Sequence, residues 1–365
     1  MNPSWKVRKY RDGDESGILE LMKAIYGRWH SPQYWEWKYK KNPAGSSIIC
    51  LAAEEDGKVV GHYGSIPFSM KLGNSYVKAS FNTDGATHPM YRGQGVFSVL
   101  VNKCHLEVAA NAIPLTYGIA DANLGPTYKR YEWAGHICFM VNMIKVIDRK
   151  AVLRSYLGNR HLGWAPRVLK KMRSATASDS SSVTVEQVNR FDSRIDEFWT
   201  TISPWHTVIV RRDQRHLNWR YADHPEQKYK IYTAMEHDQI LGYCVLGTGQ
   251  WRDLEFGYIV DIMGVRDDRD TVGCLVKTAV EYFEGCGVDV IACMMSEGHP
   301  YQRMFRRAGF LTSPLSRRQR ALYATINLQG TAIDERKAYS QALALSQNHF
   351  LRNKTNWFMM SADAP

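Results

Sequence analysis

Paired cysteines are the first feature that the sequence lacks. Its 7 cysteines are scattered singly, with no Cys-x-x-Cys pair. Structural zinc sites and disulfide frameworks depend on such closely spaced or evenly paired cysteines. We therefore expect no metal site and no disulfide framework, and we expect most cysteines to pack as small apolar residues in a reducing compartment.

Long apolar runs and a leader segment are also missing. The chain opens directly on foldable sequence, and no apolar stretch is long enough to span a bilayer. These features predict a cytoplasmic protein. Hydrophobic residues make up 44% and charged residues 23% of the 365 residues, as in ordinary globular proteins, and this length favours two domains.

Acidic residues are fewer than basic ones, 36 against 47, which gives a net charge of +11. This excess favours an acidic partner such as a phosphorylated cofactor, an anionic substrate, nucleic acid or a membrane surface. Part of it lies at Arg167–Arg173 and Arg317–Arg320, where we expect solvated faces because no nucleic-acid motif accompanies them. The sequence thus gives no firm nucleic-acid or membrane signal, and it does not indicate an oligomeric state.

Two common phosphate-binding patterns are absent, but a related arrangement is present. A predicted strand at 76–86 leads through the loop Arg92-Gly93-Gln94-Gly95 into a predicted helix at 99–110. No Gly-Lys-Ser/Thr follows, and the third glycine of a dinucleotide fingerprint is missing. A helix N-terminus offers free backbone N–H groups, the glycines allow close approach, and Arg92 adds charge. The loop therefore predicts a site for a phosphate-bearing ligand.

The rest of the first half reads as a mixed α/β (α+β) domain. Apolar periodicity and turn residues predict strands at 6–10, 48–54, 58–70, 76–86, 115–120 and 136–147, and helices at 15–26, 32–39, 99–110 and 123–133. The sheet begins antiparallel and continues into a βαβ unit with flanking helices. Composition divides the chain into a first domain at 1–148, a basic and then Ser-rich linker at 149–182, and a second domain at 183–365.

The second half repeats the first. Trp37, Tyr39 and Pro43 recur as Trp219, Tyr221 and Pro225, each 182 residues later, and further ordered matches follow. This pattern indicates a tandem duplication. The glycine loop does not recur, because residues 265–273 lack the two close glycines and contain three acids. Carboxylates there would oppose a phosphate, so we expect the second copy to lack the anion site.

These features resemble the GNAT superfamily of acyl-CoA-dependent N-acyltransferases. The family loop pattern Gln/Arg-x-x-Gly-x-Gly/Ala corresponds to Arg92–Phe97, with Phe97 where a small residue is usual. Residues Asn123 to Gly135 resemble the family's Asn…Tyr-x-x-x-Gly segment. The whole chain is similar to tandem-GNAT proteins with an active first copy and a degenerate second copy, so the resemblance implies two GNAT-like domains with the boundaries given above.

The resemblance implies acetyl-CoA, or another acyl-CoA, as co-substrate. Backbone N–H groups of the loop would bind its pyrophosphate, and its pantetheine arm would lie along the preceding strand like an added strand. The implied coenzyme-binding residues are Ala86, Thr87, His88, Arg92, Gly93, Gln94, Gly95, Val96, Phe97 and Asn123.

The resemblance also implies direct attack of a primary amine on the thioester, with a tyrosine as general acid to the thiolate. Tyr131 matches the family position and Tyr128 is the second candidate, although Tyr131 could instead be a core aromatic. The second copy has Phe305 at this position, which keeps the ring and loses the hydroxyl. Asp84 is a third candidate, for proton transfer or amine binding. Acids are disfavoured inside strands, so we expect it to face a polar cavity or to pair with a basic group.

Other functions fit part of the pattern. The chain could be a non-catalytic acyl-CoA-binding sensor, or an aminoacyl-type transferase on the same tandem fold. It could also bind nucleic acid or a membrane surface through Arg167–Arg173. As an N-acetyltransferase it would act on a small-molecule amine, and the basic charge favours an anionic acceptor such as an amino-sugar derivative.

Overall fold

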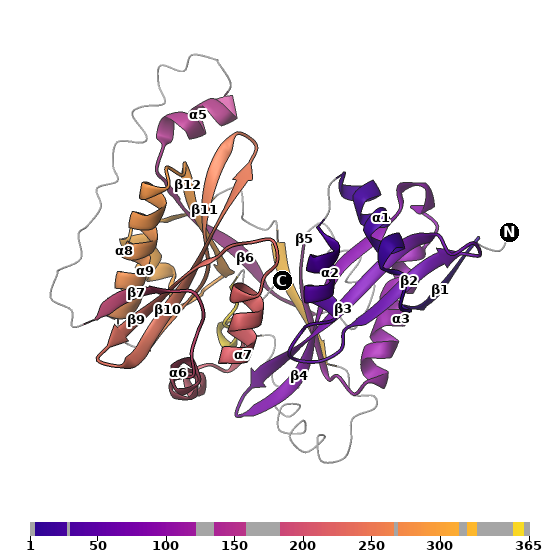
Figure 1. The fold of residues 1–365 in the computed structure, drawn as a ribbon, viewed down its shortest axis with the longest axis horizontal. Coiled ribbons are helices and arrows are strands. Elements are labelled where there is room, and N and C mark those ends of the chain that lie inside the picture. Colours follow the sequence, from indigo (N-terminus) through magenta and orange to yellow (C-terminus); the bar gives the residue numbers. More distant parts are fainter. Residues whose placement is uncertain are drawn as a thin grey trace.

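The computed structural model describes residues 4–27, 30–121, 135–157, 183–265, 269–313, 320–326 and 353–360. These residues form two lobes that follow the two halves of the sequence (Figure 1). Among them, no helix is long and apolar enough to cross a membrane. Their His, Cys, Asp and Glu side chains form no group of three that could hold a metal ion.

Within the described residues, the first half contains the strands and helices that the sequence predicts, whereas the helix predicted at 123–133 lies outside them. Its strands are β1 (Trp5–Lys9), β2 (Ile48–Glu54), β3 (Val59–Leu72), β4 (Ser75–Thr87), β5 (Leu115–Asp121) and β6 (Gly135–Val146). Its helices are α1 (Glu15–Tyr26), α2 (Pro32–Tyr39), α3 (Val96–Ala110) and α5 (Arg149–Leu157), with a one-turn 3-10 helix at Pro89–Tyr91. α5 covers the first part of the region predicted as a linker, and residues 158–182 lie outside the described residues.

The second half follows a similar order, and its first two helices are shorter than those of the first half. Its strands are β7 (Thr184–Val188), β8 (Val208–Val210), β9 (Lys230–Glu236), β10 (Gln239–Trp251), β11 (Leu254–Gly264), β12 (Val290–Ser296), β13 (Leu311–Thr312) and β14 (Arg320–Ile326). Its helices are α6 (Arg194–Ile202), α7 (Gln214–Leu217), α8 (Arg269–Gly285) and α9 (Gln302–Arg307). Single helical turns occupy Ser203–Trp205, Asn218–Ala222 and Lys354–Asn356.

One mixed sheet runs through both halves because the halves exchange strands. The order is β1-β2-β3-β4-β5-β14-β6-β12-β11-β10-β9-β7, with β13 on β6 and β8 on β3. β14, from the second half of the sequence, lies between β5 and β6 of the first. β6 then continues along β12 of the second half and passes between the lobes (Figure 1). The fold is therefore mixed α/β, mostly antiparallel, as predicted.

Helices cover both faces of the first-half sheet. Alternate residues of β2 point to opposite faces, as in any strand. Ile49 and Leu51 pack in the apolar cluster of α1 and α2, whereas Cys50 and Ala52 pack in the cluster of α3. The aromatic side chains of α2, including Trp35 and Trp37, are buried. These aromatic residues therefore form part of the core of the first half.

The two halves meet symmetrically at Trp37 and Trp219. The Trp37 indole N–H donates to the Trp219 carbonyl at 2.8 Å, and the Trp219 indole N–H donates to the Trp37 carbonyl at 3.1 Å. Their rings stack with centroids 4.9 Å apart. The offset of 182 residues that relates the two copies in sequence thus also separates the two partners of this contact. A local two-fold relation between the copies explains why each residue makes the same bond to its counterpart.

Candidate active site

The glycine loop lies open at the start of α3. Gly93 and Gly95 have φ angles of +77° and +80°, in the left-handed region that favours glycine. Gly95 is the N-cap residue of α3, and no side chain caps the first turn. A β-carbon at either glycine would meet no atom of the described residues within 4 Å. The first-turn amides therefore border a space that an anion can enter, and Arg92 is exposed beside them.

Other side chains hold the loop in shape. The oxygen of the Gln94 amide accepts a hydrogen bond from the Trp5 indole at 3.3 Å, and its nitrogen donates to the Met90 carbonyl at 3.2 Å. The His88 ring nitrogen Nδ1 accepts from the Met90 amide at 3.4 Å. Val96 is buried in the apolar cluster between α3 and the sheet. The side chains of these predicted coenzyme-binding residues thus support the loop, and a ligand would meet their backbone.

Phe97, the bulky residue of the loop, has a compensating glycine. Its ring meets Tyr63 edge-on with centroids 5.8 Å apart. A β-carbon at Gly85 would lie 2.9 Å from the Phe97 ring and 3.1 Å from the Tyr63 ring. The missing side chain at Gly85 therefore makes room for the ring that departs from the family pattern.

Strands β4 and β5 separate next to this loop. Their parallel pairing is limited to three residue pairs, Ala79–Phe81 with Leu115–Tyr117, although β4 continues to Thr87. Ala86 is buried, and the Thr87 hydroxyl is buried without a hydrogen-bond partner among the described residues. A buried hydroxyl without a partner is costly, so it is a candidate to bond a ligand. The gap between β4 and β5 thus leads from the loop into the sheet.

Asp84 lies on the separated part of β4 and pairs with a basic group. Lys38 of α2 donates to its two carboxylate oxygens at 3.1 and 2.9 Å, and the Tyr39 hydroxyl donates at 2.6 Å. Of the two environments that the sequence left open for Asp84, the structure shows the ion pair. The adjacent space, walled by Tyr34, Tyr39 and His62 among others, is too narrow to hold a water molecule.

Burial and charge shift the protonation of this cluster. Burial alone would raise the pKa of Asp84, but the ammonium of Lys38 outweighs it and lowers this pKa to about 2. Burial lowers the pKa of His62 despite the nearby carboxylate, so its ring is neutral at pH 7. The His62 Nδ1–H donates to the Asp84 carbonyl at 2.7 Å, because a carbonyl can only accept. Its Nε2 is buried without a hydrogen-bond partner among the described residues.

The two predicted tyrosine acids and one predicted coenzyme-binding residue are not among the described residues. Tyr131, Tyr128 and Asn123 fall within residues 122–134, which are outside the described residues. The counterpart of Tyr131 in the second half, Phe305 of α9, is fully buried and packs edge-on against Phe310, with ring centroids 5.0 Å apart. The roles of the three first-half residues stay predictions.

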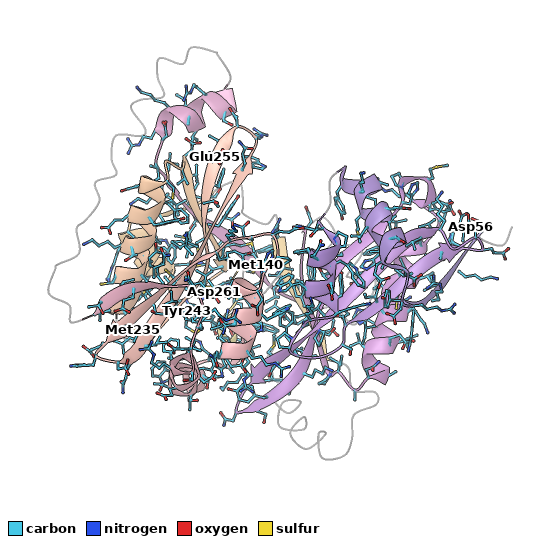
Figure 2. The ribbon with its side chains drawn as sticks, in the orientation of Figure 1. Asp56, Met140, Met235, Tyr243, Glu255 and Asp261 are labelled. Carbon is cyan, nitrogen blue, oxygen red and sulfur yellow. The ribbon has the colours of Figure 1, made fainter. Side chains whose placement is uncertain are left out.

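The second half has its own buried aspartate on the equivalent strand. The Asp261 carboxylate of β11 accepts hydrogen bonds from the Tyr221 and Tyr243 hydroxyls at 3.0 and 2.8 Å and from Arg212 at 3.3 Å. Tyr243 and Asp261 are labelled inside that lobe in Figure 2. Tyr221 is the counterpart of Tyr39, so both halves pair a buried aspartate with the same tyrosine.

Strands β11 and β12 also separate, but the chain itself fills their gap. They pair only over Phe256–Tyr258 with Val290–Ala292. Met360 forms an antiparallel bridge with Met295 of β12, and the Ser296 amide donates to the Met359 carbonyl at 3.0 Å. Because β6 covers the other edge of β12, Met360 lies on the β11 side. The four consecutive apolar residues Trp357–Met360 could have indicated a buried segment. The pairing of this segment with β12 was not predicted from the sequence.

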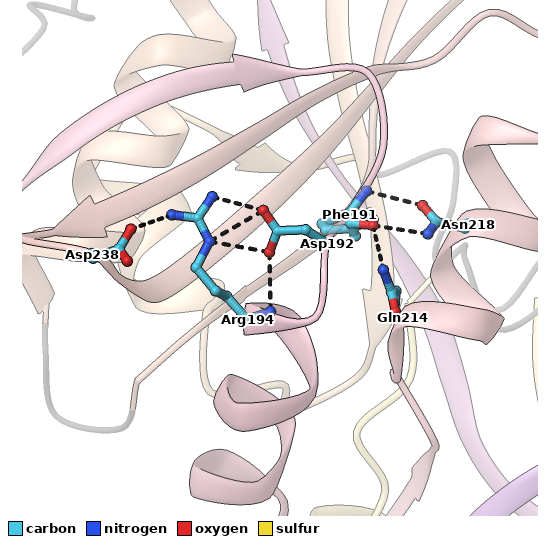
Figure 3. Close-up of polar contacts among 6 residues, drawn as sticks. All are labelled: Phe191, Asp192, Arg194, Gln214, Asn218 and Asp238. Atoms are coloured by element: carbon cyan, nitrogen blue, oxygen red, sulfur yellow. Dashed lines mark hydrogen bonds and ion pairs between the residues drawn. The ribbon is translucent and has the colours of Figure 1, made fainter.

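Polar contacts also close the second half around its short helices. Asn218 and Gln214 donate to the Phe191 carbonyl at 2.9 and 3.1 Å, and Asn218 accepts from the Phe191 amide at 2.9 Å (Figure 3). Arg194 pairs with both Asp192 and Asp238 in the same view. These contacts join the α7 region to the segment that precedes α6. They therefore fix the position of these short helices in the second half.

The comparisons with known structures agree on the fold. The chain is similar to a probable N-acyltransferase from Enterococcus faecalis, with a TM-score of 0.61, 12% identity, and coverage of 90% of this chain and 74% of that one. It is similar to a GCN5-related N-acetyltransferase from Anabaena variabilis, with a TM-score of 0.60, 12% identity, and coverage of 88% and 72%. It is also similar to Saccharomyces cerevisiae N-myristoyltransferase with bound myristoyl-CoA, with a TM-score of 0.59, 12% identity, and coverage of 89% and 79%. The chain thus has an N-acyltransferase fold.

The family comparison gives the more particular assignment. Residues 6–135 match the model of the acetyltransferase (GNAT) domain. A comparison with curated proteins found no match. The region that contains the glycine loop, residues 6–135, therefore matches a GNAT domain, as its motifs indicated.

Proposed function

We propose that the chain is an acyl-CoA-dependent N-acetyltransferase that transfers an acetyl group from acetyl-CoA to a primary amine by direct attack. The GNAT domain and the N-acyltransferase fold support the transfer of an acyl group. We propose acetyl as the acyl group because it is the default in this family.

The contrast between the two strand gaps carries the proposal. In the first half the gap between β4 and β5 adjoins an open glycine loop, and the Thr87 hydroxyl there has no partner among the described residues. In the second half Met359 and Met360 bond to β12 on the side of the equivalent gap. An extended pantetheine arm can add to the open edge of β4 as a strand would, while its pyrophosphate meets the loop amides. One coenzyme per chain is therefore expected.

Tyr131 is the proposed general acid to the departing thiolate, with Tyr128 as the second candidate. Asp84 enters the proposal as a charged group beside the gap. Its low pKa makes it a weak proton acceptor, so binding or orienting the amine suits it better than proton removal. The attacking amine must be neutral, so its proton leaves to another base or to water.

A hollow of about 470 Å³ beside the loop bears on the acceptor. It lies between α1 and the turn from β2 to β3, with His88 on its wall, and its charged lining includes Asp14, Glu20, Asp56 and Lys58. This lining is more acidic than basic, which opposes the preference for an anionic acceptor that the net charge of +11 suggests. The acceptors to be tested must therefore include both cationic and anionic amines.

The test has two stages. Acetyl-CoA should raise the melting temperature of the protein, and calorimetry should give one site per chain. Release of free thiol is then measured with glucosamine 6-phosphate, spermidine, lysine and a short peptide with a free N-terminus. Release with any of them supports the transferase, and Tyr131→Phe should lower kcat without weakening coenzyme binding. Failure of acetyl-CoA to bind refutes the proposal, and binding without thiol release favours a sensor.

A further inference from the structure

The backbone of Asp84 is in an unusual conformation for its residue type. Its φ angle is +52°, in the left-handed region, inside a strand. The register of β3 and β4 shifts between His62 and Gly64, so β4 carries an extra residue there. Non-glycine residues rarely adopt this conformation, and it persists only where the surroundings impose it.

Three side chains bind the carboxylate and the backbone carbonyl of Asp84. Lys38 and Tyr39 of α2 bind the carboxylate, and the ring of His62 binds the carbonyl from β3. Lys38 and His62 are buried, and the carboxylate itself is 13% exposed. The left-handed residue of β4 is thus held from α2 on its carboxylate side and from β3 on its carbonyl side.

The bulge lies against the loop on its other side. Gly85, the next residue, packs its α-carbon close to the ring of Phe97, in the first turn of α3. The Asp84 bulge therefore stands between the α2 cluster and the coenzyme loop, at the point where β4 leaves β5. Backbone N–H groups in this segment are those that a thioester carbonyl in the gap would meet.

Comparison with Asp261 in the second half shows which features around Asp84 are found in the first half alone, among the described residues. Asp261 is also buried and also binds a tyrosine of the α2 counterpart, Tyr221. The φ angle of Asp261 is not in the left-handed region. Tyr243, which donates to the Asp261 carboxylate, takes the place that His62 has beside Asp84. A buried aspartate bound by tyrosine is thus common to both halves. β11 also carries an extra residue beside its aspartate, so the left-handed φ angle of Asp84 and the histidine on its carbonyl are what distinguish the first half.

We propose that Lys38, Tyr39 and His62 are positioning residues that hold the Asp84 bulge in shape, so that the backbone of β4 is aligned with the thioester. This inference rests on the proposed function. It assigns the cluster an effect on the rate of acyl transfer and not on coenzyme affinity, because the loop and not the bulge binds the pyrophosphate. No acid or base role for these three side chains is needed.

The matched pair Tyr39→Phe and Tyr221→Phe tests the effect on rate. Each substitution removes one tyrosine hydroxyl that donates to a buried aspartate, Asp84 in the first half and Asp261 in the second. With acetyl-CoA and the best amine of the panel, Tyr39→Phe should lower kcat at least fivefold and leave KM for acetyl-CoA within twofold. Tyr221→Phe should leave both within twofold. Equal effects of the two variants on kcat, or a change in KM alone, would overturn the positioning role.

A second pair tests the shape of the bulge without any activity. His62→Leu removes the donor to the Asp84 carbonyl, whereas His62→Asn keeps an amide N–H near the place of Nδ1. By hydrogen exchange, peptides covering residues 82–88 should exchange at least tenfold faster in His62→Leu, and His62→Asn should lie closer to the wild type. Unchanged exchange in His62→Leu overturns the inference whatever the activity. Absence of thiol release by the wild type refutes the proposed function alone.

Discussion

Substitution of the loop glycines separates backbone strain from coenzyme binding. Gly93, Gly95 and Gly73 have φ angles of +77°, +80° and +61°, and a β-carbon at any of them would meet no atom within 4 Å. Alanine at each position should therefore cost about 1–2 kcal/mol through backbone conformation alone. Gly73 lies in the turn before β4, at the other end of that strand from the loop, so Gly73→Ala is the matched control.

Coenzyme binding should respond to only two of these substitutions. A methyl group at Gly93 or Gly95 occupies the space through which a phosphate reaches the first-turn amides, and we expect at least tenfold weaker binding. At acetyl-CoA 100-fold above the wild-type Kd, the wild type and Gly73→Ala should gain about 2.7 kcal/mol of stability. A tenfold weaker variant gains about 1.4 kcal/mol under the same conditions.

Thermal unfolding with and without acetyl-CoA measures both quantities on one sample. The strain appears as a lower melting temperature without ligand, by about 2–4 °C per kcal/mol in domains of 150–250 residues. The binding defect appears as a smaller increase on adding acetyl-CoA. If Gly95→Ala gains as much from acetyl-CoA as Gly73→Ala does, the glycine loop does not bind the coenzyme.

Three further predictions concern stability. The pKa of Asp84 is lowered from 3.8 to about 2, so its charge stabilises the folded state above pH 4, and about 2 kcal/mol is lost as the pH falls towards 2. Urea unfolding across this range should show a flatter acid dependence in Asp84→Asn, and an unchanged one would contradict the ion pair. Trp37→Phe and Trp219→Phe each leave a buried carbonyl without its donor and should each cost about 1–3 kcal/mol; clearly unequal costs would contradict the two-fold contact. Gly85→Ala should cost about 1–3 kcal/mol through its clash with Phe97. A double-mutant cycle with Phe97→Ala should recover part of this, and additive losses would refute the clash.

Local signals in the sequence predicted most elements of the first half. α1 and β2 begin and end where predicted, because an amphipathic period and flanking turn residues mark both ends of each. α3 begins at Val96, three residues before the prediction, because Gly95 caps the helix in a conformation that composition does not reveal. Because strands disfavour acids, Asp84 was predicted either to face a polar cavity or to pair with a basic group. Its partner, Lys38, lies 46 residues away on a helix, and no local pattern indicates that pairing.

Long-range pairings were the part that sequence reasoning could not provide. The exchange of β6 and β14 depends on which strand edges remain open after each half has formed its own pairs. The segment Trp357–Met360 enters the second-half gap for the same reason. Periodicity describes which face of an element is apolar, and it does not identify the neighbour that covers that face. The domain boundaries and the roles of Tyr131, Tyr128 and Asn123 stay predictions.

The position of β14 has a consequence for synthesis of the chain on the ribosome. Domains generally fold in order as they emerge, N-terminal first. Here the strand that joins β5 to β6 is encoded at residues 320–326, near the end of the chain. A nascent chain that stops before these residues has its glycine loop but an incomplete sheet beside it. The first half of the protein is therefore translated early, but its sheet becomes complete only after residues 320–326 have been made.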